Sequence, residues 1–122
     1  MDKLAEIMDW KRKEIASRVR PVSERELTRC GELTKHRPSF YDALCRDQGL
    51  AVIAEIKRKS PSAGQISDMV DATDQARKYL NANVDCMSVL TDEKYFGGTL
   101  KDLWEVTDYV QQHRRSVPCL RK

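Results

Sequence analysis

Long hydrophobic runs are absent from this sequence of 122 residues. No apolar stretch approaches the ~20 residues that a membrane-spanning helix requires. The N-terminal residues also lack the succession of charged, apolar and small residues that is typical of a secretory signal peptide. We therefore expect a cytoplasmic protein with no membrane partner, whose four cysteines stay reduced.

Metal ligands and an excess of one charge are also scarce. The cysteines are widely spaced with no C-x-x-C pair, and only two histidines could complete a ligand set, so we expect no metal site. Lys and Arg number 22 against 19 Asp and Glu, a net charge of +3 with both signs interspersed. This balance does not indicate a nucleic-acid partner.

The length allows one modest domain and excludes large single-domain folds in complete form. A closed (β/α)8 TIM barrel needs ~250 residues, so a barrel-like pattern in this chain would be a piece of that fold.

The first 48 residues have a helical pattern. Apolar residues on one face predict a helix over 2–19, which Pro21 ends. Ser23 and Glu26 form a capping-box pattern that predicts a short helical turn through Leu27. A third helix is predicted over 40–46, with Ser39 as its N-cap and Gly49 as a stop. We interpret residues 1–48 as a helical extension.

Residues 49–122 alternate between strand and helix patterns. Apolar runs predict strands over 50–57, 84–91 and 117–122, and helical spacing occupies 71–80 and 99–112. This β-α-β-α-β order is typical of parallel sheets with right-handed crossovers, so the three strands should be parallel neighbours in chain order. The α/β pattern fits half of a doubly wound sheet or the first part of a barrel, and periodicity does not choose between them.

Polar residues gather near the end of the first strand. Its alternation places Glu55 and Lys57 on one face, at the end where α/β proteins keep their reactive groups. The alternative is an ordinary structural ion pair. The loop over 57–64 then combines three cations with hydroxyls and glycine, which suits an anionic substrate or, equally, a solvated turn.

Three motifs resemble the indole-3-glycerol-phosphate synthase family. They are AEIKRKSPS at 54–62, SVLTDEKYFGG at 88–98 and PCLRK at 118–122. The resemblance extends over essentially the whole chain and includes the family's helical N-terminal extension. It implies a (β/α)8 TIM barrel, of which this chain would hold the extension, the first three parallel strands and two helices.

The resemblance also implies an activity and a set of site residues. Members of the family are lyases of tryptophan biosynthesis, without cofactor, that close the indole ring on 1-(2-carboxyphenylamino)-1-deoxyribulose 5-phosphate with loss of carbon dioxide and water. By resemblance Glu55, Lys57 and Lys122 match catalytic residues, Ser60 matches a substrate-contacting serine, and Phe96 matches the wall of the anthranilate pocket. Asp92 and its charged neighbours are read as a solvated loop that positions Phe96.

The remaining strands of such a barrel, with their phosphate site, are not in this sequence. We therefore expect the chain alone to be inactive, and its open strand edges to make it marginally stable or prone to self-association. The alternative is a non-catalytic remnant that binds a phosphorylated metabolite or assembles with a complementary chain.

Overall fold

The computed structural model describes residues 2–46, 49–68 and 71–122. The chain forms two compact units, Met1–Arg37 and Pro38–Lys122. The boundary expected after residue 48 falls at residues 47–48, which lie outside the described part. Among the described residues, none of the helices is both long and apolar enough to cross a membrane.

The first unit contains two helices that begin at side-chain caps. In α1 (Lys3–Ile15), the Asp2 carboxylate accepts a hydrogen bond of 2.8 Å from the Ala5 N–H. In α2 (Glu24–Thr34), Ser23 and Glu26 form the predicted capping box. Neither helix has a buried residue, so both are defined chiefly by local interactions.

Both helices differ in length from their predictions. The helix predicted to residue 19 ends at Ile15, although Val19 continues the apolar spacing. Residues 16–18 form a turn in which the Val19 N–H donates to the Ile15 carbonyl at 3.1 Å. Val19 is 68% exposed and Pro21 disfavours helix at the residue before it, so the helix does not continue beyond this turn. The turn predicted to end at Leu27 continues to Thr34, because no proline interrupts it once the capping box has started the helix.

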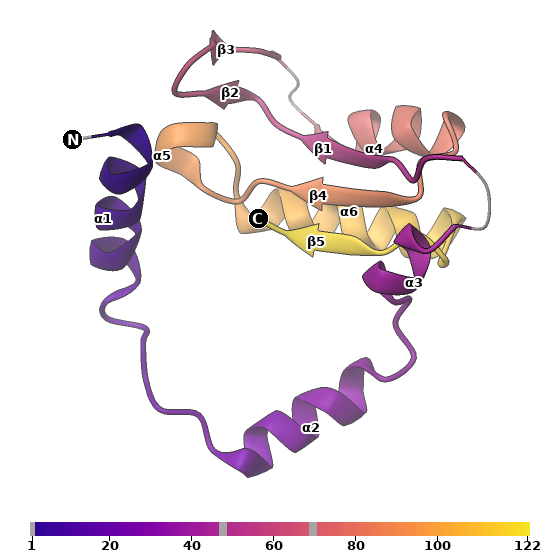
Figure 1. Ribbon diagram of the computed structural model, residues 1–122, viewed down its shortest axis with the longest axis horizontal. Helices are drawn as coiled ribbons and strands as arrows, with labels where there is room; N and C mark the ends of the chain where they lie inside the picture. Colours follow the sequence, from indigo (N-terminus) through magenta and orange to yellow (C-terminus); the bar gives the residue numbers. More distant parts are fainter. Residues whose placement is uncertain (1, 47–48, 69–70) are drawn as a thin grey trace. The chain divides into compact units, whose positions relative to one another are not determined.

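The second unit is built on a parallel sheet of three strands (Figure 1). These are β1 (Ile53–Ile56), β4 (Cys86–Val89) and β5 (Cys119–Arg121), in the order β1-β4-β5. The predicted parallel arrangement in chain order is confirmed, with shorter strands than the apolar runs suggest. No closed barrel is formed by the described residues.

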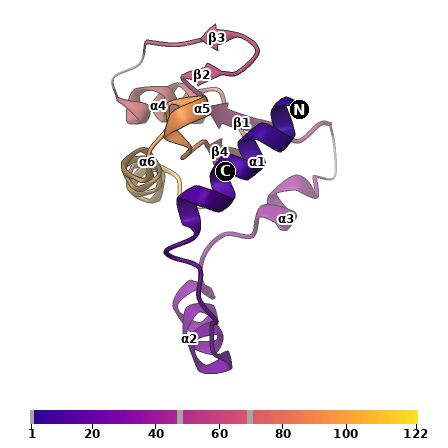
Figure 2. The same ribbon diagram turned by 90° about the vertical axis from the view of Figure 1, so that its left-hand side faces the viewer.

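Helices cover the sheet unequally. Helices α4 (Ala72–Asn81) and α6 (Leu100–His113) pack on one face, and both lie on the same side of the strands in Figure 2. On the other face, the short helix α3 (Phe40–Leu44) lies in front of the sheet, near the starts of the strands (Figure 1). The core lies between the sheet and the two long helices and includes Ala54, Ile56, Ala72, Ala76, Leu80, Met87, Val89, Val106 and Val110.

Two segments expected as loops contain regular structure. Strands β2 (Lys59–Ser60) and β3 (Gly64–Gln65) form a small antiparallel hairpin, and α5 (Glu93–Phe96) follows β4. Both lie beyond the C-terminal ends of the parallel strands (Figure 1). Strands of two residues and a helix of one turn are too short to show a recognisable hydrophobic periodicity in the sequence.

Candidate active site

Polar side chains from three strands meet at the C-terminal end of the sheet. Glu55 of β1 is their centre. Its Oε2 lies 3.1 Å from the Lys57 Nζ, and its Oε1 accepts hydrogen bonds from Lys122 Nζ at 2.8 Å and from Ser88 Oγ at 3.1 Å. The structure therefore brings together the three residues that match catalytic residues by the family resemblance.

Backbone pairing explains this meeting. Glu55 lies opposite Ser88 in the register of β1 and β4. Lys122 follows β5, and its N–H donates to the Val89 carbonyl at 2.9 Å while its carbonyl accepts from the Thr91 N–H at 2.8 Å. Ser88 has Glu55 on one side and Leu120 on the other. Side chains two residues apart on a strand share a face, so Lys122 lies on the face of Leu120, one step further along, and its side chain reaches Glu55 across β4.

The charges around Glu55 keep it ionised. Burial of the carboxyl acts to raise the pKa of Glu55, but hydrogen bonds and attraction from Lys122 and Lys57 outweigh burial, and the pKa lies below its ordinary value. The Glu55 side chain is 24% exposed, so these interactions are only partly screened by water. A carboxylate between two ammonium groups can accept and relay protons.

Helix α5 places an aromatic ring beside this cluster. Lys57 Nζ lies 5.7 Å from the centroid of the Phe96 ring, within the range of a cation–π contact. Asp92, which the sequence suggested to be part of a solvated loop, is instead the N-cap of α5. Its side chain accepts a hydrogen bond from the Tyr95 N–H at 2.7 Å, and Asp92 is only 7% exposed. That interpretation of Asp92 was wrong.

Two glycines hold this aromatic segment against the end of β4. Gly97 ends α5 with φ of +68°, a conformation that L side chains rarely adopt. A Cβ at Gly98 would lie 1.8 Å from the Leu90 carbonyl oxygen, so only glycine fits there. The position of Phe96 thus depends on a backbone path that a larger residue would displace.

Arg58 links the loop after β1 to the first turn of α6 through an ion pair. Its guanidinium forms a two-point ion pair with Asp102, one contact being 2.8 Å, and donates to the Gly97 carbonyl at 3.2 Å. Asp102 is also the acidic member of the capping box that Thr99 begins. Arg58 and Lys57 are therefore both paired with carboxylates, which does not favour the reading of this loop as a general anion site.

The other loop residues remain apart from the cluster. Ser60 Oγ accepts from the Ala63 N–H at 3.1 Å and lies 3.4 Å from Ser62 Oγ, so its contacts within the described residues are those of its own turn. Lys59 forms no ion pair with a described residue and is half-buried. Its carbon chain lies near Gly97.

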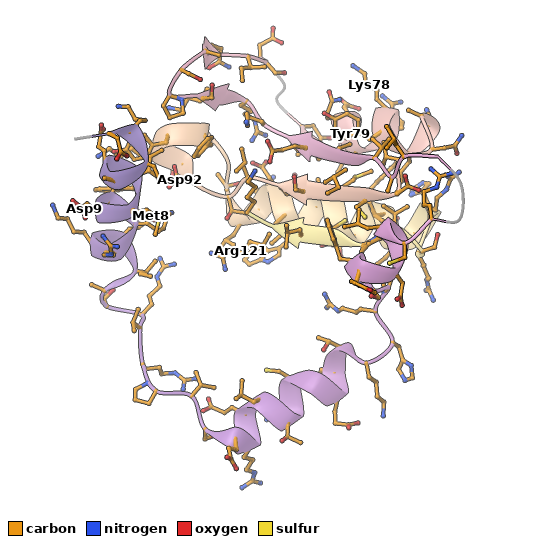
Figure 3. All side chains as sticks on the ribbon, in the orientation of Figure 1. Met8, Asp9, Lys78, Tyr79, Asp92 and Arg121 are labelled. Atoms are coloured by element: carbon orange, nitrogen blue, oxygen red, sulfur yellow. The ribbon has the colours of Figure 1, made fainter. Side chains whose placement is uncertain are left out.

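Two residues that contact Glu55 were missed in the sequence. Ser88 was seen only as part of a motif, and alternation along the second strand would have given its face but not the register that places it beside Glu55. Tyr79 on α4 donates from its hydroxyl to the Glu55 backbone carbonyl at 2.8 Å, and Figure 3 shows its side chain between α4 and β1. No sequence signal links Tyr79 to β1.

The donor set gives no indication of a metal centre. In the parts of the chain that the structure describes, no three or more His, Cys, Asp or Glu side chains are grouped so that they could hold a metal ion.

Comparison with known proteins gives a consistent result. A family model described as indole-3-glycerol phosphate synthase matches residues 4–119. A relative of that name in Opitutus terrae is 53% identical over 122 residues, covering 99% of this chain and 46% of the relative. Relatives of the same name in Oceanobacillus iheyensis and Aquifex aeolicus are each 38% identical, covering 98% of this chain and 42% and 43% of their own lengths.

The chain thus spans less than half the length of these curated relatives. The family match nevertheless covers nearly all of the chain, including β1, β4 and the helices that position Glu55, Lys57 and Phe96. The resemblance found in the sequence is confirmed, and the chain belongs to the indole-3-glycerol phosphate synthase family.

Proposed function

We propose that this chain supplies part of the active site of an indole-3-glycerol-phosphate synthase that is completed by the remaining strands of a (β/α)8 barrel. In this proposal residues 1–48 are the helical extension and 49–122 are the first three strands with their two helices. The substrate is the phosphorylated 1-(2-carboxyphenylamino)-1-deoxyribulose 5-phosphate, and the protein needs no cofactor for the reaction.

The chemistry requires acids that act in sequence. Attack of the aromatic ring carbon on the ribulose ketone forms a carbon–carbon bond and places negative charge on the ketone oxygen, which an ammonium group of Lys57 or Lys122 stabilises and protonates. Carbon dioxide then leaves, and its bonding electrons return to the ring. The new hydroxyl departs with a proton as water, while Glu55 takes a proton from the methylene carbon beside the nitrogen, and the electrons of that C–H bond form the double bond of the indole ring.

The observation that carries this proposal is the Glu55 carboxylate held between two ammonium groups beside the Phe96 ring. The arrangement offers proton donors, a proton acceptor and a flat apolar surface within one small region. Ser60 would reach the substrate only from the β2–β3 hairpin, and its role as a binding residue rests on the family resemblance.

A chimera tests the proposal directly. Residues 1–122 would replace the matching part of the Opitutus terrae relative, and ring closure would be followed by the fluorescence of the indole product. We expect activity in the chimera and its loss in a Glu55→Gln variant of unchanged far-UV circular dichroism. A folded chimera without ring closure would contradict the proposal.

The 122-residue chain by itself provides a second test. We expect no measurable ring closure, because effective catalysis needs both ends of the substrate held together. Ring closure by the purified chain would contradict the proposal that the remaining strands supply part of the active site. Tight binding of a phosphorylated metabolite without turnover, by both the chain and the chimera, would support the non-catalytic alternative.

A further inference from the structure

We propose that Ser88 is a positioning residue that fixes the Glu55 carboxylate for proton transfer, an inference that rests on the function proposed above. Ser88 is in the central strand β4, is 4% exposed, and donates from Oγ to Glu55 Oε1 at 3.1 Å. It does not itself need to touch the substrate, because it acts through Glu55.

The sheet geometry requires a small side chain at this position. Neighbouring strands lie ~4.8 Å apart, so β1 and β5, on either side of β4, are separated by ~10 Å. The Glu55 and Lys122 side chains nevertheless meet at 2.8 Å. The register pairs Ser88 with Glu55 on one side and with Leu120 on the other, and Lys122 follows two residues beyond Leu120. Ser88 and Lys122 donate to the same oxygen, Glu55 Oε1, so a large side chain at residue 88 would push this oxygen away from Lys122.

The hydroxyl group adds a donor that the lysines cannot replace. Among the described residues, the charged groups that contact Glu55 are Lys57, directly after β1, and Lys122, directly after β5. Lys122 is 58% exposed on a flexible stem. Each ammonium group loses its charge when it gives up a proton to the substrate, which weakens its hold on the carboxylate. The Ser88 hydroxyl stays neutral throughout and is fixed by the buried central strand, so it keeps Glu55 Oε1 in place during these steps.

Three substitutions in the chimera distinguish the effect of the hydroxyl group from the effect of side-chain volume at residue 88. S88A removes the hydroxyl without adding bulk. Thr and Val have nearly the same shape but only Thr keeps the hydroxyl, so S88T and S88V form a matched pair in which any difference reports the donor. Both are β-branched residues that suit a strand.

The readouts are the pH dependence of kcat, the KM, and a ¹³C NMR titration of the Glu55 carboxyl, assigned by comparison with E55Q. S88A and S88V lose a hydrogen bond to a charged group, so we expect kcat to fall ~10-fold with a smaller change in KM. The Glu55 titration and the acidic limb of the kcat profile should both move up by roughly one pH unit. S88T should recover most of what S88V loses.

Two results would overturn the proposal. One is an S88A chimera with the kcat, pH profile and Glu55 titration of the parent. The other is an equal loss in S88T and S88V, which would mean that only the volume of residue 88 matters. If the parent chimera folds without ring closure, the proposed function fails, and the NMR titration still decides whether Ser88 sets the ionisation of Glu55.

Discussion

Helices α1 and α2 are stabilised over short distances along the chain, whereas the α/β unit depends on contacts between distant residues. The ion pair of Arg12 with Asp9 spans three positions and is exposed on both sides. By contrast, Lys122 reaches Glu55 across 67 positions and Arg58 reaches Asp102 across 44. Long-range contacts form only when the sheet has assembled, so the chemistry and most of the cooperativity belong to the second unit.

The largest effect should come from a lysine that the sheet positions. In the active chimera, Lys57→Ala should lower kcat by ~10² to 10³, because one preorganised donor near a developing oxyanion is lost. Lys59→Ala is the matched control, since it removes the same charge two residues along the chain. It should mainly raise KM, about fivefold, and less at high salt. Equal losses of kcat in two folded variants would contradict the different placement of these lysines.

A pair of glycine substitutions compares the two units for stability. Gly98→Ala should lower the free energy of unfolding by about 3 kcal/mol, because its Cβ would collide with the Leu90 carbonyl oxygen. Gly31→Ala in α2 meets no atom within 4 Å and should stabilise the helix by up to ~1 kcal/mol. Urea denaturation and helical circular dichroism measure the two effects. A harmless Gly98→Ala would show that the backbone between β4 and α6 relaxes freely.

Ion pairs should differ between the units in the same way. Burial acts to raise the pKa of Asp102, but Arg58 and Thr99 outweigh it and the pKa lies below its ordinary value. Asp102→Ala leaves Arg58, whose side chain is 17% exposed, without this carboxylate and should lower the free energy of unfolding by about 2 kcal/mol. Asp9→Ala, which removes an exposed pair, should cost less than ~0.5 kcal/mol.

The Asp102 effect has a defined pH dependence. Since the pKa is lower in the folded than in the unfolded state, the stabilisation is complete above the unfolded value and is lost as the pH falls toward the folded one. The difference in urea midpoint between the parent chain and Asp102→Ala should therefore shrink on acidification from pH 5. A difference that is constant with pH would indicate that the ion pair is not its source.

The smallest effect is expected in the local capping of α2. The Arg20 guanidinium and the Ser23 backbone and hydroxyl lower the pKa of Glu26 to about 2. The stabilisation of the helix start is thus present above the ordinary Glu value and lost as the pH falls toward 2. Arg20→Gln should raise the Glu26 pKa in an NMR titration and leave the urea midpoint of the α/β unit unchanged. A shifted midpoint would mean that the two units unfold together.

Much of this architecture was predictable because its signals are local. The capping box at Ser23, the Ser39 cap and the parallel order of the strands follow from patterns within a few residues and from the handedness of crossovers. Alternation within one strand likewise predicted that Glu55 and Lys57 share a face. The motifs identified the family, and the matching of residues 4–119 confirms it.

The sequence by itself therefore determined the helix starts, the strand order and which residues of β1 face the site, since each depends on nearest neighbours along the chain. Only the tertiary structure decided that Ser88 and Lys122 both contact Glu55, that Arg58 is held by Asp102, and that Gly98 must be glycine. These features depend on the register between strands and on how closely separate segments approach. Glu55 and Ser88 are 33 positions apart and Arg58 and Asp102 are 44 positions apart, so these contacts form only when the core packs. Gly98 and Leu90 are closer along the chain, but their approach depends on the folded backbone path between β4 and α6, which no local pattern encodes.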